Sequence, residues 1–150
     1  MNRPDLSLSE ELSAAGLVEQ SAEDIREDRI HAQVAFCGTD LSSREWAEVV
    51  FEQAYFFKAN LAHSRWRRLE LGDVLLDQCN LANVRLAGCR GRRVEEYRSR
   101  LTGANLADVR LADCLFHRCK LDLAVLHEAR LENCRFEHCD LSEADFQGAR

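Results

Sequence analysis

The chain contains seven cysteines and five histidines, the residue types best suited to bind a metal or to act in nucleophilic catalysis. Six cysteines share one register, separated by multiples of five residues, which matches no zinc-binding pattern. The histidines lie outside that register, either in outward positions or before the repeat, and no serine, cysteine or aspartate is placed to form a relay with them. No glycine-rich phosphate loop is present. We therefore expect no metal, no cofactor and no enzymatic activity. The cysteines are Cys79, Cys89, Cys114, Cys119, Cys134 and Cys139; the histidines are His31, His63, His117, His127 and His138.

Arginine is the other group with chemistry to offer, because guanidinium groups bind carboxylates and phosphates. Residues 90–100 carry five arginines and a tyrosine, and further arginines recur at intervals of twenty residues from Arg90. A second basic patch comes from Arg65, Arg67, Arg68 and Arg85. The alternative interpretation is a solvated face neutralised by nearby acids such as Asp73, Asp113 and Glu132. The candidate partner-binding residues are Arg90, Arg92, Arg93, Tyr97, Arg98, Arg100, Arg110 and Arg130.

These residues belong to a repeat of five. Of the 23 positions taken every fifth residue from Phe36 to Phe146, 21 hold Leu, Phe or Trp. The position two residues earlier is small in 22 of 24 cases, with Arg44 and Leu69 as the exceptions. Helices repeat at 3.6 residues and strands at two, so neither accounts for this period. Units this short must stack on one another, which predicts an all-β solenoid with one continuous core.

A longer period of twenty shows how many units make one turn. Trp46 and Trp66 are twenty residues apart, as are Phe116 and Phe136. Four pentapeptides per turn would stack like residues at about the 4.8 Å strand spacing. The inward cysteines alternate with Ala and Val, so we expect reduced packing thiols, with Cys114–Cys134 and Cys119–Cys139 bridges as the alternative. The core repeat is best seen in Leu41, Leu61, Leu81, Leu101, Leu121 and Leu141.

Three segments resemble the A(D/N)LXX signature of the pentapeptide repeat family: Ala59–His63, Ala104–Asp108 and Ala144–Gly148. About 115 of the 150 residues fit the pattern. The resemblance implies a right-handed quadrilateral β-helix whose central Leu or Phe and preceding small residue point inward. It says little about function, because the pattern describes a core.

The pattern breaks at Gly91 and Glu96. Burying an unpaired glutamate costs several kcal/mol, so a bulge is expected there. Two interpretations of residues 90–100 remain open. Either the segment stays in the wall with local distortion, or ten residues form a loop and the coil resumes two walls later.

Residues 1–33 precede the repeat, which we assign to 34–150. Ser7–Glu10 predicts a helix reaching Ala15 and ending at Gly16, and Ser21–Asp24 predicts a second helix through about Arg29. These would form a helical cap over the first coil, with Leu17 and Ile25 among the covering residues. The alternative is an acidic arm, because the segment holds eight acids and three arginines.

The two ends of the chain and its composition give three further expectations. No apolar stretch is long enough to span a membrane and no secretory signal is evident, so a cytoplasmic protein is predicted. The last coil has no cap, which predicts a homodimer through that coil or a chain that is a fragment of a longer protein.

The function predicted is a non-catalytic protein-binding module with an unknown partner. Some members of the resembled family bind type II topoisomerases such as DNA gyrase by imitating DNA, and this implied partner is one alternative. It requires an acidic tube, whereas residues 34–150 have a net charge of only −1. Nucleic acid is a weaker option, because aromatic residues do not interleave with the arginines. The remaining alternative is a structural domain of a longer protein.

Overall fold

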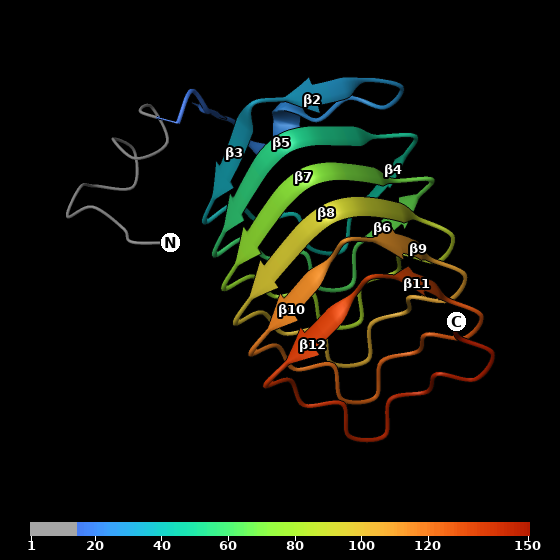
Figure 1. Cartoon of the computed structure of the whole chain (residues 1–150). Helices are drawn as coiled ribbons and strands as arrows, with labels where there is room; N and C mark the ends of the chain where they lie inside the picture. The colour runs from blue at the N-terminus through green and yellow to red at the C-terminus, as the bar shows by residue number, and fades with distance from the viewer. Residues whose placement is uncertain (1–14) are drawn as a thin grey trace.

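The computed structural model describes residues 15–150, which form an all-β parallel solenoid of about six turns (Figure 1). From Ile30 onward each strand pairs in parallel with the strand twenty residues away, as Phe56 with Leu76 and Phe116 with Phe136 show. Four pentapeptides per turn are thus confirmed. No helix in the described part of the chain is long and apolar enough to cross a membrane.

Two of the four walls are made of β-strands. Wall A has the inward centres His31, Phe51, Leu71, Gly91, Leu111 and Leu131, and wall B has Phe36, Phe56, Leu76, Glu96, Phe116 and Phe136. Wall A contains β2 (Ile30–Ala32), β9 (Arg110–Ala112) and β11 (Arg130–Glu132), while wall B contains β3 (Val34–Cys37), β10 (Leu115–His117) and β12 (Arg135–Glu137). Three longer strands run through both walls: β5 (Val50–Phe57), β7 (Glu70–Asp77) and β8 (Arg90–Tyr97).

The other two walls consist mainly of turns. An Asn or Asp before the central residue accepts a hydrogen bond from the amide two residues on, as Asn60 does from Ala62 at 3.1 Å and Asn105 from Ala107 at 3.1 Å. This side-chain turn explains why the A(D/N)LXX signature appears on these walls. Wall C has centres Leu41, Leu61, Leu81, Leu101, Leu121 and Leu141; wall D has Trp46, Trp66, Leu86, Leu106, Leu126 and Phe146, with β4 (Glu45–Ala47) and β6 (Arg65–Arg67).

The core is a column of like side chains. The rings of Trp46 and Trp66 stack with centroids 4.5 Å apart, and those of Phe116 and Phe136 stack at 4.9 Å. The predicted leucine column is buried from Leu41 to Leu121, and Leu141 in the last coil is half-buried. Stacking residues of equal size lets successive layers of the core pack closely against one another.

Each corner of the tube is turned by a residue with positive φ. These residues lie two positions after every centre, every fifth residue from Asp28 to Gly148, and most are not glycine. The side chains at these corners are polar with one exception, Leu123, whose φ is 61° and which is 52% exposed. The left-handed conformation turns the chain by the same amount at each corner, which keeps the walls flat.

Residues 90–97 form β8 within the wall. Gly91 pairs with Leu71 and Leu111, and Glu96 pairs with Leu76 and Phe116. The expected bulge is therefore wrong, and no loop leaves the coil. Leu111 fills the space that Gly91 leaves, because a Cβ on that glycine would lie 2.9 Å from the Leu111 Cδ2 atom.

In the described part of the chain, from residue 15 onward, the N-terminal segment closes the first coil without the second predicted helix. Only a 3-10 helix, Ala22–Asp24, forms where the second helix was expected, although Ser21 and Asp24 do make the capping box. After this short helix the chain joins the first turn of the coil, where the backbone amide of Asp28 donates a hydrogen bond to the carbonyl of Glu48 in the next turn. The first predicted helix falls almost wholly on residues 1–14, outside the described part of the chain, and Ala15–Gly16 is a turn.

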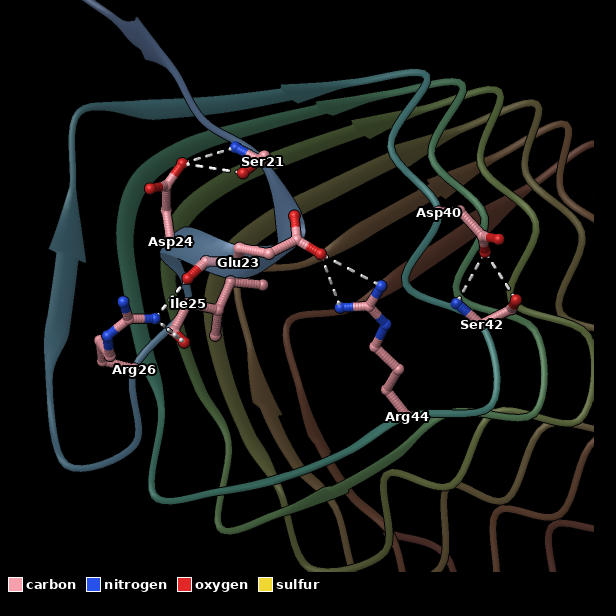
Figure 2. Close-up of polar contacts among 8 residues, drawn as sticks. All are labelled: Ser21, Glu23, Asp24, Ile25, Arg26, Asp40, Ser42 and Arg44. Carbon is pink, nitrogen blue, oxygen red and sulfur yellow. Dashed lines mark hydrogen bonds and ion pairs between the residues drawn. The ribbon is translucent and has the colours of Figure 1, made fainter.

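One long side chain connects the cap to the coil at the open end of the tube, in addition to backbone contacts. Arg44 occupies an inward position and reaches across to Glu23, with both terminal nitrogens 3.4 Å from the carboxylate (Figure 2). Ile25, two residues after Glu23, is buried. β1 (Val18–Glu19) pairs with β3 and covers its free edge. Arg44, one of the two exceptions to the small inward residue of the repeat, thus contacts the cap at the end of the solenoid.

Candidate functional site

An arginine ladder runs along the corner between walls D and A. We use this name for Arg90, Arg110, Arg130 and Arg150. The first three begin β8, β9 and β11 and pair directly with one another. Arg150 continues the series, because its amide donates to Ala129 and its carbonyl accepts from Leu131. Successive guanidinium groups therefore rise from backbones about 4.8 Å apart.

The repeat itself places these side chains outside the tube. Each ladder residue directly precedes an inward centre, and neighbouring residues of a strand point to opposite faces. All four are exposed. Asp108 and Glu128 lie on the far side of a groove of about 160 Å³ that Arg110, Arg130 and Arg150 also line. The site is therefore a shallow, fixed row of cations with two carboxylates along its rim.

No acid in the described residues forms an ion pair with the ladder, although Glu70 is the direct strand neighbour of Arg90. Asp73 is held by Arg93, with Nε 2.5 Å and Nη2 2.8 Å from its oxygens, and this contact lowers the pKa of Asp73. Asp113 accepts a hydrogen bond from Asn133 at 2.7 Å. Within residues 15–150, no carboxylate oxygen comes within 4.0 Å of a ladder guanidinium nitrogen. The ladder thus keeps its charge available to a ligand.

The family follows from the repeat and from sequence comparison together. The model of the pentapeptide repeats family matches eight copies within residues 99–137 and 119–150. The same coil, with the same inward positions, continues in the structure back to β2. Residues 99–150 thus carry pentapeptide repeats of this family, and the coil that they form extends back to β2.

Solved pentapeptide repeat proteins are similar at low sequence identity. A trypsin-treated form of QnrB1, a plasmid-mediated fluoroquinolone resistance protein, is 17% identical, with a TM-score of 0.43 over 89% of this chain and 68% of that one. HetL, involved in heterocyst differentiation regulation in the cyanobacterium Nostoc sp. strain PCC 7120, is 13% identical, with a TM-score of 0.32 over 99% and 95%. A comparison with curated proteins finds no match.

The other predicted contact residues lie elsewhere on the pentapeptide coil, apart from the ladder. Arg92 is exposed on wall A, and Arg93 is engaged with Asp73. Tyr97, Arg98 and Arg100 lie on wall B or at its far corner. There Tyr97 donates to Glu95 at 3.0 Å, Arg98 donates to both oxygens of Asp77, and Arg100 donates to Thr102 at 3.4 Å. Of the predicted set, only Arg90, Arg110 and Arg130 come together, and Arg150 joins them.

Glu96 occupies an inward position of the pentapeptide coil and is 6% exposed. Among residues 15–150 its Oε2 atom has no hydrogen-bond partner, and burial raises the pKa of this carboxyl to about 8. It borders a small apolar cavity of about 30 Å³ lined by leucines, among them Leu71, Leu76 and Leu86. A protonated carboxyl can lie in such surroundings at neutral pH, which is why the wall continues without a bulge.

His31 is the buried histidine that the sequence pattern missed. It lies inward on wall A, directly above Phe51, although we expected all histidines outside the coil or before it. Its Nε2 atom is 3.1 Å from both the amide and the carbonyl of Arg26. The five-residue spacing from Phe36 was the available signal, but the register was taken to begin at Val34.

All seven cysteines are free, including the pairs considered for bridging. The inward thiols donate to the carbonyl of the central residue 23 positions earlier, as Cys79 does to Phe56 at 3.3 Å and Cys139 to Phe116 at 3.2 Å. Burial raises the pKa of Cys79 and Cys119 to about 12 and that of Cys89 and Cys114 to about 11. These thiols behave as packing groups.

The four buried thiols are expected to resist modification until the coil unfolds. Because the thiolate is the reactive form, a pKa of about 11 or 12 leaves almost none of it at pH 8. Titration with a thiol reagent at that pH should modify Cys37, Cys134 and Cys139 first, and all seven cysteines only in denaturant. Rapid native modification of Cys79 or Cys119, located by peptide mass spectrometry, would contradict the packing described.

Proposed function

We propose that this solenoid is a non-catalytic protein-binding module whose contact surface is the arginine ladder. The observation that carries the proposal is the in-register row of Arg90, Arg110 and Arg130 with no carboxylate in ion-pairing distance within residues 15–150. The partner is inferred to present a row of Asp or Glu side chains, because guanidinium groups bind carboxylates in two-pronged geometry.

The ladder is suited to this role because its charges are fixed by the backbone. Like charges directly opposite one another in a sheet repel, so the free protein carries an unfavourable interaction that an acidic partner relieves. The backbone that carries the ladder arginines is already ordered in the free protein, which limits the entropic cost of association. Such a contact is screened by salt, so its affinity should fall with ionic strength.

The charge pattern does not favour a DNA mimic. A surrogate for a duplex needs a continuous negative wall, whereas each wall of this tube carries both signs. Wall A bears the ladder beside Glu70 and Glu132, and wall D bears Arg65 and Arg85 beside Glu45. A homodimer through the last coil stays a prediction; Phe136, Leu141 and Phe146 are partly exposed there.

The test compares two double variants with the same change in charge. Arg110→Gln with Arg130→Gln removes the middle of the ladder, and Arg67→Gln with Arg118→Gln removes two exposed arginines elsewhere. A labelled oligoglutamate peptide serves as the probe in fluorescence anisotropy at low salt. We expect the ladder variant to weaken binding at least about tenfold and the control less than about twofold, because charged hydrogen bonds are lost only in the first.

Two outcomes would overturn the proposal. Equal weakening in both double variants would show a response to net charge alone, and unchanged binding in the ladder variant would show that the contact lies elsewhere. Affinity capture with the same pair of variants then identifies the partner as a protein retained by the control and lost by the ladder variant.

A further inference from the structure

A second pocket lies at the corner between walls C and D, one corner away from the ladder. Its volume is about 300 Å³, and it spans several coils of the tube. Arg65 and Arg85 line its wall D side, and His63, Asn83 and Gly103 line its wall C side. Glu45 and Asn105 complete the lining on the wall D side, one coil beyond each of the two arginines.

Gly103 lets the Asn83 side chain lie close against the backbone on the wall C side of the pocket. Gly103 has a φ of +68°, and a Cβ there would lie 2.4 Å from the Oδ1 atom of Asn83. The asparagine side chain therefore settles over the glycine, where any other residue at this corner would push it away. The pocket lies between the two arginines on one side and His63 with Asn83 on the other.

The lining is rich in hydrogen-bond donors without a protein acceptor. Arg65 and Arg85 pair directly through their backbones, so their guanidinium groups project from adjacent levels of the same wall. Neither has a carboxylate oxygen within 4.0 Å in the part of the chain described here. Glu45 is the single acid of the lining and forms no ion pair with either arginine. Two guanidinium groups, an imidazole and two carboxamides thus line a common space, with the Glu45 carboxylate at one end.

We propose that this pocket binds an oxoanion of the phosphate class. The two guanidinium groups offer parallel N–H donors at two levels, an arrangement that matches the tetrahedral oxygens of phosphate better than a single planar carboxylate. Bound phosphate would also relieve the repulsion between the two stacked arginines. Glu45 sets a limit on the site, because it disfavours an anion large enough to extend past Arg65. The occupant is therefore a single phosphate group, either free or carried as a phosphomonoester.

The experiment is calorimetric titration of the full chain with inorganic phosphate and, separately, with O-phosphoserine. Arg85→Gln should weaken binding of the anion at least about tenfold, because it removes charged hydrogen bonds. Arg67→Gln is the matched control: it lies in the same strand as Arg65, loses the same charge and does not line the pocket. Circular dichroism verifies that each variant folds, and Arg65→Gln serves as a second variant if Arg85→Gln does not.

The two titrants distinguish the sources of the anion. Tighter binding of inorganic phosphate identifies the free ion, and tighter binding of phosphoserine identifies a phosphomonoester; either result supports the proposal when Arg85→Gln weakens binding of the preferred titrant at least about tenfold. The proposal is overturned if neither titrant binds, or if Arg85→Gln and Arg67→Gln weaken binding equally. These results do not depend on the ladder, whose own variants test the protein-binding proposal.

Discussion

Replacing Glu96 with leucine is expected to raise the free energy of unfolding by about 3 kcal/mol at pH 7. The wild-type carboxyl is buried, its Oε2 atom has no hydrogen-bond partner in the described residues, and burial raises its pKa to about 8. At pH 7 the folded chain must therefore keep a proton that the unfolded chain has released. Leucine has a similar volume, fits between Leu76 and Phe116 in the column, and removes that penalty. Urea denaturation monitored by circular dichroism measures the difference.

The same substitution should flatten the pH dependence of stability. An unfolded glutamate titrates near its ordinary pKa of about 4.5, so between about pH 4.5 and pH 8 the folded state binds one more proton than the unfolded state. Raising the pH across that window therefore favours unfolding, by about 1.4 kcal/mol per unit or about 4 kcal/mol from pH 5 to pH 8. Above pH 8 the loss is complete.

Glu95→Leu is the control for this experiment, because Glu95 is the exposed neighbour and should change stability by less than about 0.5 kcal/mol. Its pH profile should follow the wild type. The assignment is wrong if wild-type stability does not fall between pH 5 and pH 8, or if Glu96→Leu retains the wild-type slope.

The sequence was sufficient to predict the fold because side-chain size repeats on two periods at once. The five-residue period identifies the inward positions, and the twenty-residue match between Trp46 and Trp66 fixes four units to a turn. Both signals come from packing of apolar side chains, which leaves a visible pattern of residue size in the sequence. The backbone conformation at Glu96 was harder to predict. The cost of burying a charge predicted a bulge, whereas a protonated carboxyl avoids most of that cost.

The corners of the tube could not be inferred from residue types. Positive φ recurs at every fifth residue, but the positions concerned hold Asp, Gln, Lys, Arg, Glu, His and Leu as well as Asn and Gly. Exposed sites of any fold favour such polar residues, so the pattern does not reveal the backbone conformation. The N-terminal cap was misjudged for a related reason. Ser21 and Asp24 do form a capping box, yet pairing with the coil ends the helix after one turn.

The candidate site was predictable only in the part that the register controls. Arg90, Arg110 and Arg130 are brought together because each directly precedes a wall A centre. Which acid pairs with which arginine depends on side-chain conformation instead. Asp73 was expected near the ladder and is bound to Arg93. The pocket at Arg65 and Arg85, where Gly103 forms part of the lining, is also not revealed by sequence spacing.

Replacing Leu101 with alanine is expected to lower the free energy of unfolding by about 3 to 5 kcal/mol. Leu101 is 1% exposed and lies in the column between Leu81 and Leu121, so its loss leaves a cavity that the flat, backbone-bonded layers on either side cannot collapse to fill. Urea denaturation gives the midpoint and the slope. Because a solenoid is coupled only between neighbouring coils, the transition should also broaden or split as the two halves unfold apart.

Leu141→Ala is the matched control, the same substitution in the same column but in the last coil, where the side chain is already partly exposed. It should lower the free energy of unfolding by only about 1 to 2 kcal/mol, because folding buries less apolar surface at that position. Unfolding should remain a single transition, because a change in the last coil does not divide the stack into two parts. The difference between the two variants measures how far the core is continuous along the tube. Equal losses from both would contradict that continuity, since stability would then depend on residue type and not on depth within the stack.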